Sequence, residues 1–280
     1  GTSIATAAMR ALPIGFPKLM VSTLASGNTA HYLGTKDITM MPSIVDVAGL
    51  NRISKIIFTR AAGAICGMVD ARVEASDERP LIVASMFGNT TDCINAAIPL
   101  LEAAGYEVLV FHSTGAGGRA MESLIESGLV AGVLDITTTE WADELVGGTL
   151  SAGKSRMDAV AKAAVPSIVV PGCLDMVNFG ERESLPEKFA SRTLYIHNPQ
   201  VTLMRTNVEE CRQLGTILAS KVNSYTAPTT VLIPRQAISV ISAEGGPFHD
   251  AQADAALFDA IESTLSEGVE VRSLDLKIND

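Results

Sequence analysis

Residues 81–91 read LIVASMFGNTT, and the order of residue types in this stretch recurs along most of the chain. The apolar and small residues 81–85 are typical of a strand buried inside a parallel sheet. Glycine, asparagine and threonine follow directly, and residues 92–104 have helical character. A strand, a polar loop and a helix in this order predict the first part of a βαβ unit.

The same order continues toward the C-terminus. Further apolar runs lie at 108–111, 133–136, 167–170, 194–196, 231–233 and 269–274. Helices are expected near 118–127, 139–147, 155–164, 207–222 and 253–264. Such alternation predicts parallel strands joined by right-handed crossovers. We therefore predict an α/β fold of two Rossmann-like three-layer domains with mostly parallel sheets, the first of them truncated.

The smaller domain is expected at residues 1–76, with strands at 18–23 and 38–41 and a helix at 52–69. Gly1, Thr2 and Ser3 form a turn that leads directly into a helix, and such a turn normally follows a strand. We therefore expect the natural protein to carry a preceding segment. The charged stretch 74–80 ends in proline and predicts a linker, so the second domain is expected at 77–280.

The composition excludes several classes of protein. The chain is 47% hydrophobic and 19% charged, with a net charge of −10 and no basic cluster, which argues against nucleic-acid binding. No run of about 18 apolar residues is present, which argues against a membrane span. The four cysteines are widely spaced and form no CxxC pair, which indicates reduced thiols and a cytoplasmic location.

Polar residues and glycines gather in the loops that follow the predicted strands. In an open parallel sheet, ligands bind beyond the carboxyl ends of the strands, so these loops are the candidate site. The residues that we expect to contact a substrate are Asn89, Thr90, Thr114, Gly115, Gly117, Gly118, Thr138, Gly172 and Asn178.

The most glycine-rich of these loops spans residues 113–119, STGAGGR. Glycines let a backbone approach an anion, and a following helix N-terminus offers free amides. The loop lacks the P-loop sequence and the GxGxxG spacing. A flexible turn with a helix cap is an equally good interpretation.

Three residues are candidates for catalysis: Glu140, Asp175 and His197. Glu140 is either a carboxylate favoured by the dipole at a helix N-terminus or a general base. Asp175 lies in an expected ten-residue loop, 171–180, and ordered loops beside a sheet edge often carry function. All four histidines are expected in loops, where a structural role remains open for each. Without HxH or HExxH spacing, no metal site is predicted.

Several long blocks resemble one known family. They are ALPIGFPK (11–18), VSTLASG (21–27), PSIVDVAGLN (42–51), ASMFGNTT (84–91), TTTE (137–140), PGCLDMVNFG (171–180), HNPQVTLMRT (197–206) and GGPFHD (245–250). Together they cover essentially the whole chain. The chain resembles the family of the tomato mosaic virus resistance protein, a Tm-one-like ATP-binding group.

The resemblance implies two α/β domains, ATP as cofactor, Mg²⁺ as a candidate companion ion, and a homo-oligomer. It also implies that the first domain begins about a hundred residues upstream and that only the end of its glycine-rich phosphate loop is present here. Residues that the resemblance places at the nucleotide are Gly1, Thr2, Ser3, Ser22, Ser26, Gly27 and Thr35. A separate chain that supplies the preceding segment is a further expectation.

Three hypotheses on function follow. The first is an ATP-binding enzyme, or enzyme subunit, that acts on a small anionic metabolite in an interdomain cleft. The second is a nucleotide-independent lyase, hydrolase or transferase of a carboxylated or phosphorylated metabolite. The third is a non-catalytic scaffold whose oligomeric state responds to ATP.

Overall fold

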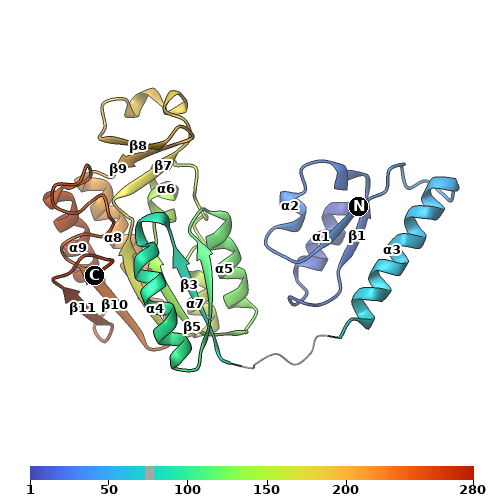
Figure 1. Cartoon of the computed structure of the whole chain (residues 1–280), viewed down its shortest axis with the longest axis horizontal. Coiled ribbons are helices and arrows are strands. Elements are labelled where there is room, and N and C mark those ends of the chain that lie inside the picture. Colours follow the sequence, from blue (N-terminus) through green and yellow to red (C-terminus); the bar gives the residue numbers. More distant parts are fainter. Residues whose placement is uncertain (73–78) are drawn as a thin grey trace. The chain divides into compact units, whose positions relative to one another are not determined.

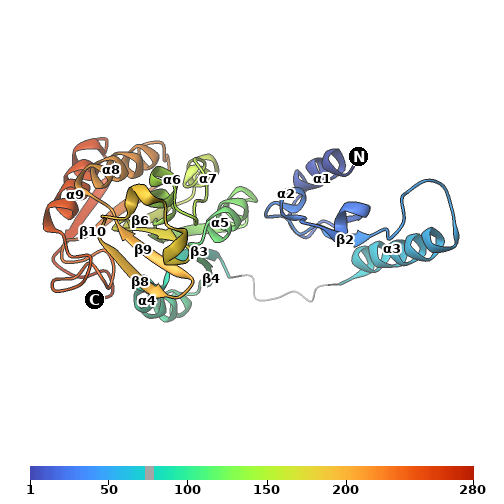
Figure 2. The same ribbon diagram turned by 90° about the horizontal axis from the view of Figure 1, so that it is seen from above.

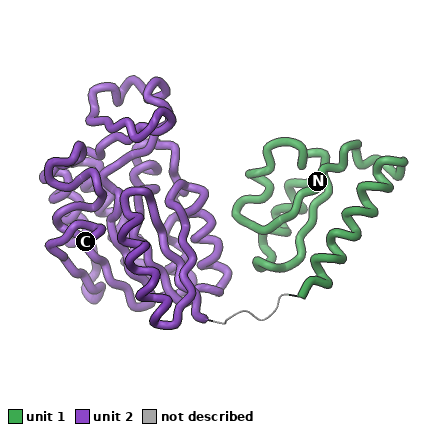
Figure 3. The backbone as a smooth tube through the Cα atoms, viewed as in Figure 1, with its two compact units in different colours: residues 1–78 green, residues 79–280 purple. Residues whose placement is uncertain are grey.

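The structure is a computed structural model that describes residues 1–72 and 79–280. The chain divides into two compact units, Gly1–Glu78 (unit 1) and Arg79–Asp280 (unit 2) (Figure 3). The predicted domain boundary after residue 76, and most of the predicted linker, lie outside the described residues.

Unit 1 holds a two-stranded parallel sheet with helices beside it (Figure 1). Its elements are α1 (Thr2–Arg10), β1 (Leu19–Ser22), the short 3₁₀ helix η1 (Thr23–Ser26), α2 (Ala30–Leu33), β2 (Thr39–Pro42) and α3 (Arg52–Asp70). Asn51 starts α3 with a capping box, because its side chain accepts from the Ser54 amide while Ser54 Oγ accepts from the Asn51 amide. The strands and the long helix agree with the segments that the sequence predicts.

Unit 2 is built around a six-stranded sheet in the order β11-β10-β6-β5-β3-β4. The strands are β3 (Leu81–Met86), β4 (Glu107–His112), β5 (Val130–Thr137), β6 (Ser167–Gly172), β10 (Thr229–Pro234) and β11 (Glu270–Leu274). Every pair of neighbours in this sheet is parallel. The predicted α/β fold with mostly parallel sheets is therefore confirmed.

Helices cover both faces of this sheet (Figures 1 and 2). They are α4 (Thr91–Ala103), α5 (Ala116–Glu126), α6 (Glu140–Val146), α7 (Asp158–Ala163), α8 (Val208–Val222) and α9 (Ala251–Thr264). Successive strand residues point to opposite faces, so Val83 packs with α5 and α7 whereas Ala84 packs with Ile94 of α4. No helix in residues 1–72 and 79–280 is long and apolar enough to cross a membrane.

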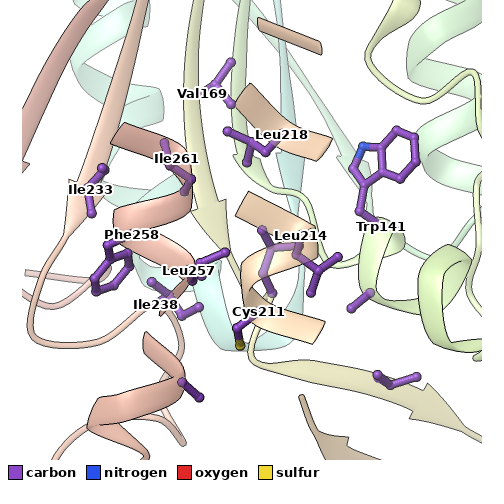
Figure 4. Close-up of a cluster of buried hydrophobic side chains, with 14 of the residues drawn as sticks. Trp141, Val169, Cys211, Leu214, Leu218, Ile233, Ile238, Leu257, Phe258 and Ile261 are labelled. Carbon is purple, nitrogen blue, oxygen red and sulfur yellow. The ribbon is translucent and has the colours of Figure 1, made fainter. Parts of the chain in front are cut away.

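The largest buried cluster lies between the sheet and helices α6, α8 and α9. Figure 4 shows Leu214 and Leu218 of α8 at its centre, with Trp141 of α6 on one side and Leu257 of α9 on the other. Five buried α8 side chains recur at helical spacing, which fixes this face of the helix against the sheet. The cluster therefore anchors α6, whose first turn lies at the carboxyl edge of the sheet.

Two local predictions are wrong. The predicted parallel strand at 194–196 is β8 (Leu194–Asn198), which pairs antiparallel with β9 (Val201–Arg205). The predicted loop 171–180 contains β7 (Met176–Phe179), which pairs antiparallel with β9. Pro199 and Gln200 form the turn between β8 and β9, and a two-residue turn of this kind between two apolar runs is typical of a hairpin. The three strands form a separate sheet in the order β7-β9-β8.

Candidate functional site

In unit 1, the N-terminus of α1 meets the carboxyl end of β1. The two side-chain oxygens Thr2 Oγ1 and Ser22 Oγ lie 2.8 Å apart, and they join the first residue of α1 to the last residue of β1. Ser22 is buried, and its Oγ also accepts from the Leu24 amide at 3.1 Å. Among the described residues no side chain caps α1, so a side chain does not satisfy the amides of its first turn. This arrangement of strand end and helix N-terminus is the usual setting for a bound anion.

The other predicted nucleotide residues of unit 1 lie at both ends of the strands. Gly1 and Ser3 flank Thr2, while Ser26 and Gly27 end the 3₁₀ helix that follows β1. Thr35 lies before β2 and therefore at the amino end of that strand. A Cβ atom on the adjoining Gly34 would lie 3.2 Å from Cδ of Arg10, the last residue of α1. The structure thus brings Thr2 and Ser22 together and places Thr35 at the opposite end of α1.

In unit 2, the carboxyl edge of the sheet is closed by a buried ion cluster around Arg156. Its guanidinium donates to Asp135 Oδ1 at 2.7 Å, to Glu140 Oε2 at 2.7 Å and to Glu122 Oε1 at 3.3 Å. Arg156 is 1% exposed, and these carboxylates raise its pKa well above the ordinary value despite burial, which acts in the opposite direction. The cluster ties β5, α5 and α6 to the segment that precedes α7.

The glycine-rich loop binds a carboxylate of the same protein, that of Glu140. The amides of Gly115 and Gly118 donate to Glu140 Oε1 at 2.6 and 3.1 Å. A Cβ atom on Gly118 would lie 2.1 Å from Glu140 Oε2, and one on Gly117 would lie 1.8 Å from the His112 carbonyl oxygen. Glycine is therefore required here by close packing. Glu140 has both oxygens engaged, so the structure gives it the role of an internal anion.

A second buried carboxyl, Asp143, lies one turn along α6. Its Oδ2 accepts from Asn178 Nδ2 at 2.7 Å, and its Oδ1 accepts from the amides of Asn178 and Leu150 at 3.0 and 3.2 Å. Burial raises the pKa of Asp143 from 3.8 to about 7. The pair links α6 to β7, and Asn178 Oδ1 has no partner among the described residues. Asp143 is thus a proton-binding group near neutral pH.

The predicted hydroxyl residues mostly bind the protein's own strands. Thr90 Oγ1 lies 2.7 Å from Thr137 Oγ1, and Thr138 Oγ1 donates to the Val170 carbonyl at 3.2 Å. Both threonines are fully buried. Gly172 packs against the backbone of β5, since a Cβ there would lie 2.1 Å from the Ile136 carbonyl oxygen. Asn89 and Thr114 remain half-buried at the edge of the sheet.

Asp175 belongs to a different buried group, between β6 and the segment after β10. Its Oδ2 accepts from Ser239 Oγ at 2.7 Å, whereas Oδ1 is buried without a partner among the described residues. Burial raises the pKa of Asp175 to about 6, and the positive charge of Arg205 acts against this rise. Arg205 itself pairs with Asp254 at 2.5 Å. Cys173, two residues earlier, has a φ of 59°, which is unusual for a residue other than glycine.

The four histidines lie on different elements of the chain. His31 lies in α2, His112 ends β4 and stacks on Phe87, and His197 is exposed on β8. The expectation that all four lie in loops is therefore wrong, and only His249 follows it. The strand of His197 belongs to the antiparallel sheet, and Tyr195 of that strand has its ring centroid 6.5 Å from that of His197 and 6.4 Å from that of Phe248. Within the part of the chain that the structure describes, no three His, Cys, Asp or Glu side chains are grouped so that they could hold a metal ion.

Several residues of these clusters are absent from the sequence-based predictions. They are Glu122, Asp135, Asp143, Arg156, Arg205 and Ser239. For two of these residues, the sequence pattern itself indicated a buried charge. Asp135 interrupts the apolar run VLDIT, and Arg205 ends the apolar run VTLMR. A charge inside a buried strand needs a buried partner, so each position could have been singled out.

Comparisons with known proteins match both units. The family described as "Uncharacterised protein family (UPF0261) N-terminal domain" matches residues 1–74, and the corresponding C-terminal domain matches residues 79–280. A UPF0261 protein of Clostridium tetani is 52% identical over 282 residues, which cover 100% of this chain and 70% of that protein. A UPF0261 protein of Rhizobium meliloti is 50% identical, with 100% and 71% covered.

A plant protein is also similar. The ToMV resistance protein Tm-1 of Solanum lycopersicum is 43% identical over 288 residues, which cover 100% of this chain and 38% of the plant protein. This similarity agrees with the resemblance that the sequence blocks indicate. Since the two family domains together span nearly all of its residues, the chain belongs to the UPF0261 family.

Proposed function

We propose that the protein binds a nucleotide, with ATP as the first candidate, through unit 1. The observation that carries the proposal is the contact between Thr2 Oγ1 and Ser22 Oγ, at 2.8 Å, where the N-terminus of α1 meets the carboxyl end of β1. The phosphates would accept hydrogen bonds from the first-turn amides of α1 and from these two hydroxyls. Ser3, Ser26 and Gly27 are close in sequence to this position, and Mg²⁺ would accompany the phosphates.

Electrostatics supports an anion at this position. The positive end of the α1 dipole points toward the carboxyl end of β1, and the first turn of α1 contains no acidic residue. The net charge of the chain is −10, so a local site for an anion has to be built from amides and hydroxyls rather than from an excess of basic residues. The resemblance implies the same ligand at the same residues.

Calorimetric titration of the natural protein with ATP and Mg²⁺ tests the proposal. Ser22→Ala and Thr2→Val each remove one hydroxyl of the pair and should weaken binding by about five-fold or more. Thr59→Val is the matched control, because Thr59 is exposed on α3 and is not among the residues proposed for the nucleotide. Equal binding by all three variants, or no heat with ATP at millimolar concentration, would exclude a phosphate site at the N-terminus of α1.

A second candidate function has its own observation. Asp175 has one buried oxygen without a partner in the described part of the chain, a pKa raised to about 6 and a serine hydroxyl 2.7 Å away. A carboxyl with these properties is suited to acid–base chemistry on a small anionic metabolite. Asp175→Asn should then abolish turnover whether or not nucleotide is present, while Ser22→Ala leaves turnover intact. Dependence of turnover on Ser22 alone would favour the nucleotide proposal.

Assembly remains part of the proposal. A homo-oligomer is implied by the resemblance, and a separate chain that binds unit 1 is a further candidate partner. Sedimentation with and without ATP distinguishes an ATP-responsive scaffold from an enzyme, because a scaffold changes its sedimentation coefficient while no ATP or metabolite is consumed.

A further inference from the structure

A pocket with a volume of about 590 Å³ lies between α6 and α8 on unit 2. This volume is within the range of ordinary small-molecule sites. None of the residues proposed above for nucleotide or metabolite lines it. The pocket is therefore separate from the sites proposed above.

The floor of the pocket is apolar. It is formed by Trp141 and Leu145 of α6 and by Ile217 of α8. Trp141 is 5% exposed and is the single tryptophan of the chain. Its indole Nε1 is buried and donates to no acceptor in residues 1–72 and 79–280. A flat ring, a leucine and an isoleucine together offer a surface suited to a hydrocarbon chain or ring.

The rim of the pocket carries hydroxyls and a cation. Thr216 and Ser220 are exposed and lie four residues apart on α8, which places them on one face of that helix. Lys154 is exposed and forms no ion pair within the described residues. The Thr216 hydroxyl donates to the Arg212 carbonyl at 3.1 Å, so the Lys154 ammonium and the Ser220 hydroxyl are the donors that this rim offers, and the two together suit a carboxylate.

Lys221 and Glu144 are the other charged residues of the pocket. Lys221 Nζ pairs with Asp158 Oδ1 at 2.5 Å, donates to the Lys154 carbonyl at 2.7 Å and lies 5.1 Å from the centre of the Trp141 ring. Glu144 accepts from Ser151 Oγ and forms no ion pair within the described residues. The Lys221 contacts hold the segment that carries Lys154 against α8, so the rim is built before any ligand arrives. Lys154 is then the lysine of the pocket whose ammonium has no ion pair among the described residues.

We propose that this pocket binds an amphipathic monocarboxylate. The apolar part of the ligand lies on Trp141, Leu145 and Ile217, and its carboxylate is held by Lys154 with the hydroxyl of Ser220. The site does not depend on the proposed nucleotide site, since the two share no residue and lie in different units.

Fluorescence of Trp141 provides a direct test, because no second tryptophan contributes to the signal. The natural protein is titrated with butanoate, hexanoate and octanoate, and with 1-hexanol as the uncharged counterpart of hexanoate. Each added CH₂ should tighten binding by up to about four-fold. Hexanol should bind about three-fold more weakly than hexanoate, because it loses the charge interaction with Lys154.

Three variants locate the site. Lys154→Met should weaken the binding of hexanoate by about three-fold and leave the binding of hexanol unchanged. Lys162→Met is the matched control, since Lys162 is exposed, pairs with Glu126 and does not line the pocket. Ser220→Phe, at an exposed position, should fill the pocket and abolish binding of every probe. The proposal is overturned if no saturable change in Trp141 fluorescence occurs, if affinity is independent of chain length, if Lys162→Met acts like Lys154→Met, or if Ser220→Phe binds hexanoate normally.

Discussion

Replacing the buried carboxyl of Asp143 should remove a large part of the pH dependence of unit 2. In Asp143→Asn, one side-chain oxygen continues to accept from the backbone amides of Asn178 and Leu150. The new amide nitrogen faces the Asn178 side chain, whose Oδ1 is buried and has no partner among the described residues. A half-turn of the Asn178 amide supplies an acceptor, so the substitution gives up only the long contact of 3.4 Å between Asn178 Nδ2 and Thr139 Oγ1.

The magnitude follows from the pKa of Asp143, which burial raises from 3.8 to about 7. A carboxyl whose pKa is higher in the folded state binds its proton more tightly there, so this group favours folding at low pH. Its contribution is lost as the pH rises from about 4 through about 7, and about three pKa units correspond to roughly 4 kcal/mol. When the pH rises from about 5 to about 8, the free energy of unfolding of the natural protein should therefore fall by roughly 3 kcal/mol more than that of Asp143→Asn.

Urea unfolding followed by Trp141 fluorescence measures this difference, because the single tryptophan lies on the same helix as Asp143. The comparison between natural protein and variant cancels the contribution of other titrating groups, including Asp175. Asp259→Asn, at an exposed position on α9, is the control for loss of one negative charge. If Asp143→Asn shifts the free energy of unfolding by the same amount at both pH values, Asp143 is not the proton-binding group described here.

Three further substitutions test the buried clusters and the helix cap. Gly118→Ala places a Cβ 2.1 Å from Glu140 Oε2 and should destabilise unit 2 by about 3 kcal/mol in urea unfolding, whereas Gly88→Ala, with nothing within 4 Å, should change little. Arg156→Met leaves its carboxylate partners buried without a cation, so the free energy of unfolding should fall by about 4 kcal/mol in the same assay. An unchanged urea midpoint would show that those carboxyls are neutral. Asn51→Ala removes the cap of α3 and should cost about 1 kcal/mol, seen as a lower thermal midpoint of the helical circular dichroism signal.

The parallel sheet could be predicted because its central strands are apolar without alternation. Residues 81–84 (LIVA) and 231–233 (VLI) show this pattern, whereas the edge strands β4 and β11 are largely exposed. The strand at 194–196 has the same apolar appearance, yet it pairs with β9 in the antiparallel sheet. Apolar character alone does not determine the partner of a short strand, and the turn at Pro199 was the only local indication of a hairpin.

The sequence predicted where the residues of the candidate site lie better than it predicted what they contact. The glycine-rich loop and Glu140 do lie at the carboxyl edge of the sheet, as their places in the sequence indicate. Their mutual contact joins residues that are 25 positions apart, and no local pattern specifies such a pairing. Arg156 shows the same limit, because a single arginine between two helices reads as an ordinary surface residue until the carboxylates around it are known.

The carboxylate that fills the glycine-rich loop is covalently attached to the fold, and this has a consequence for competition. A tethered group acts at an effective concentration of millimolar or more, and here it is additionally held by Arg156. Phosphate or a metabolite arriving from solution would have to displace a neighbour that never diffuses away. A glycine-rich loop after a strand can thus bind a side chain of the same protein. Its sequence does not distinguish it from a loop that binds a ligand from solution.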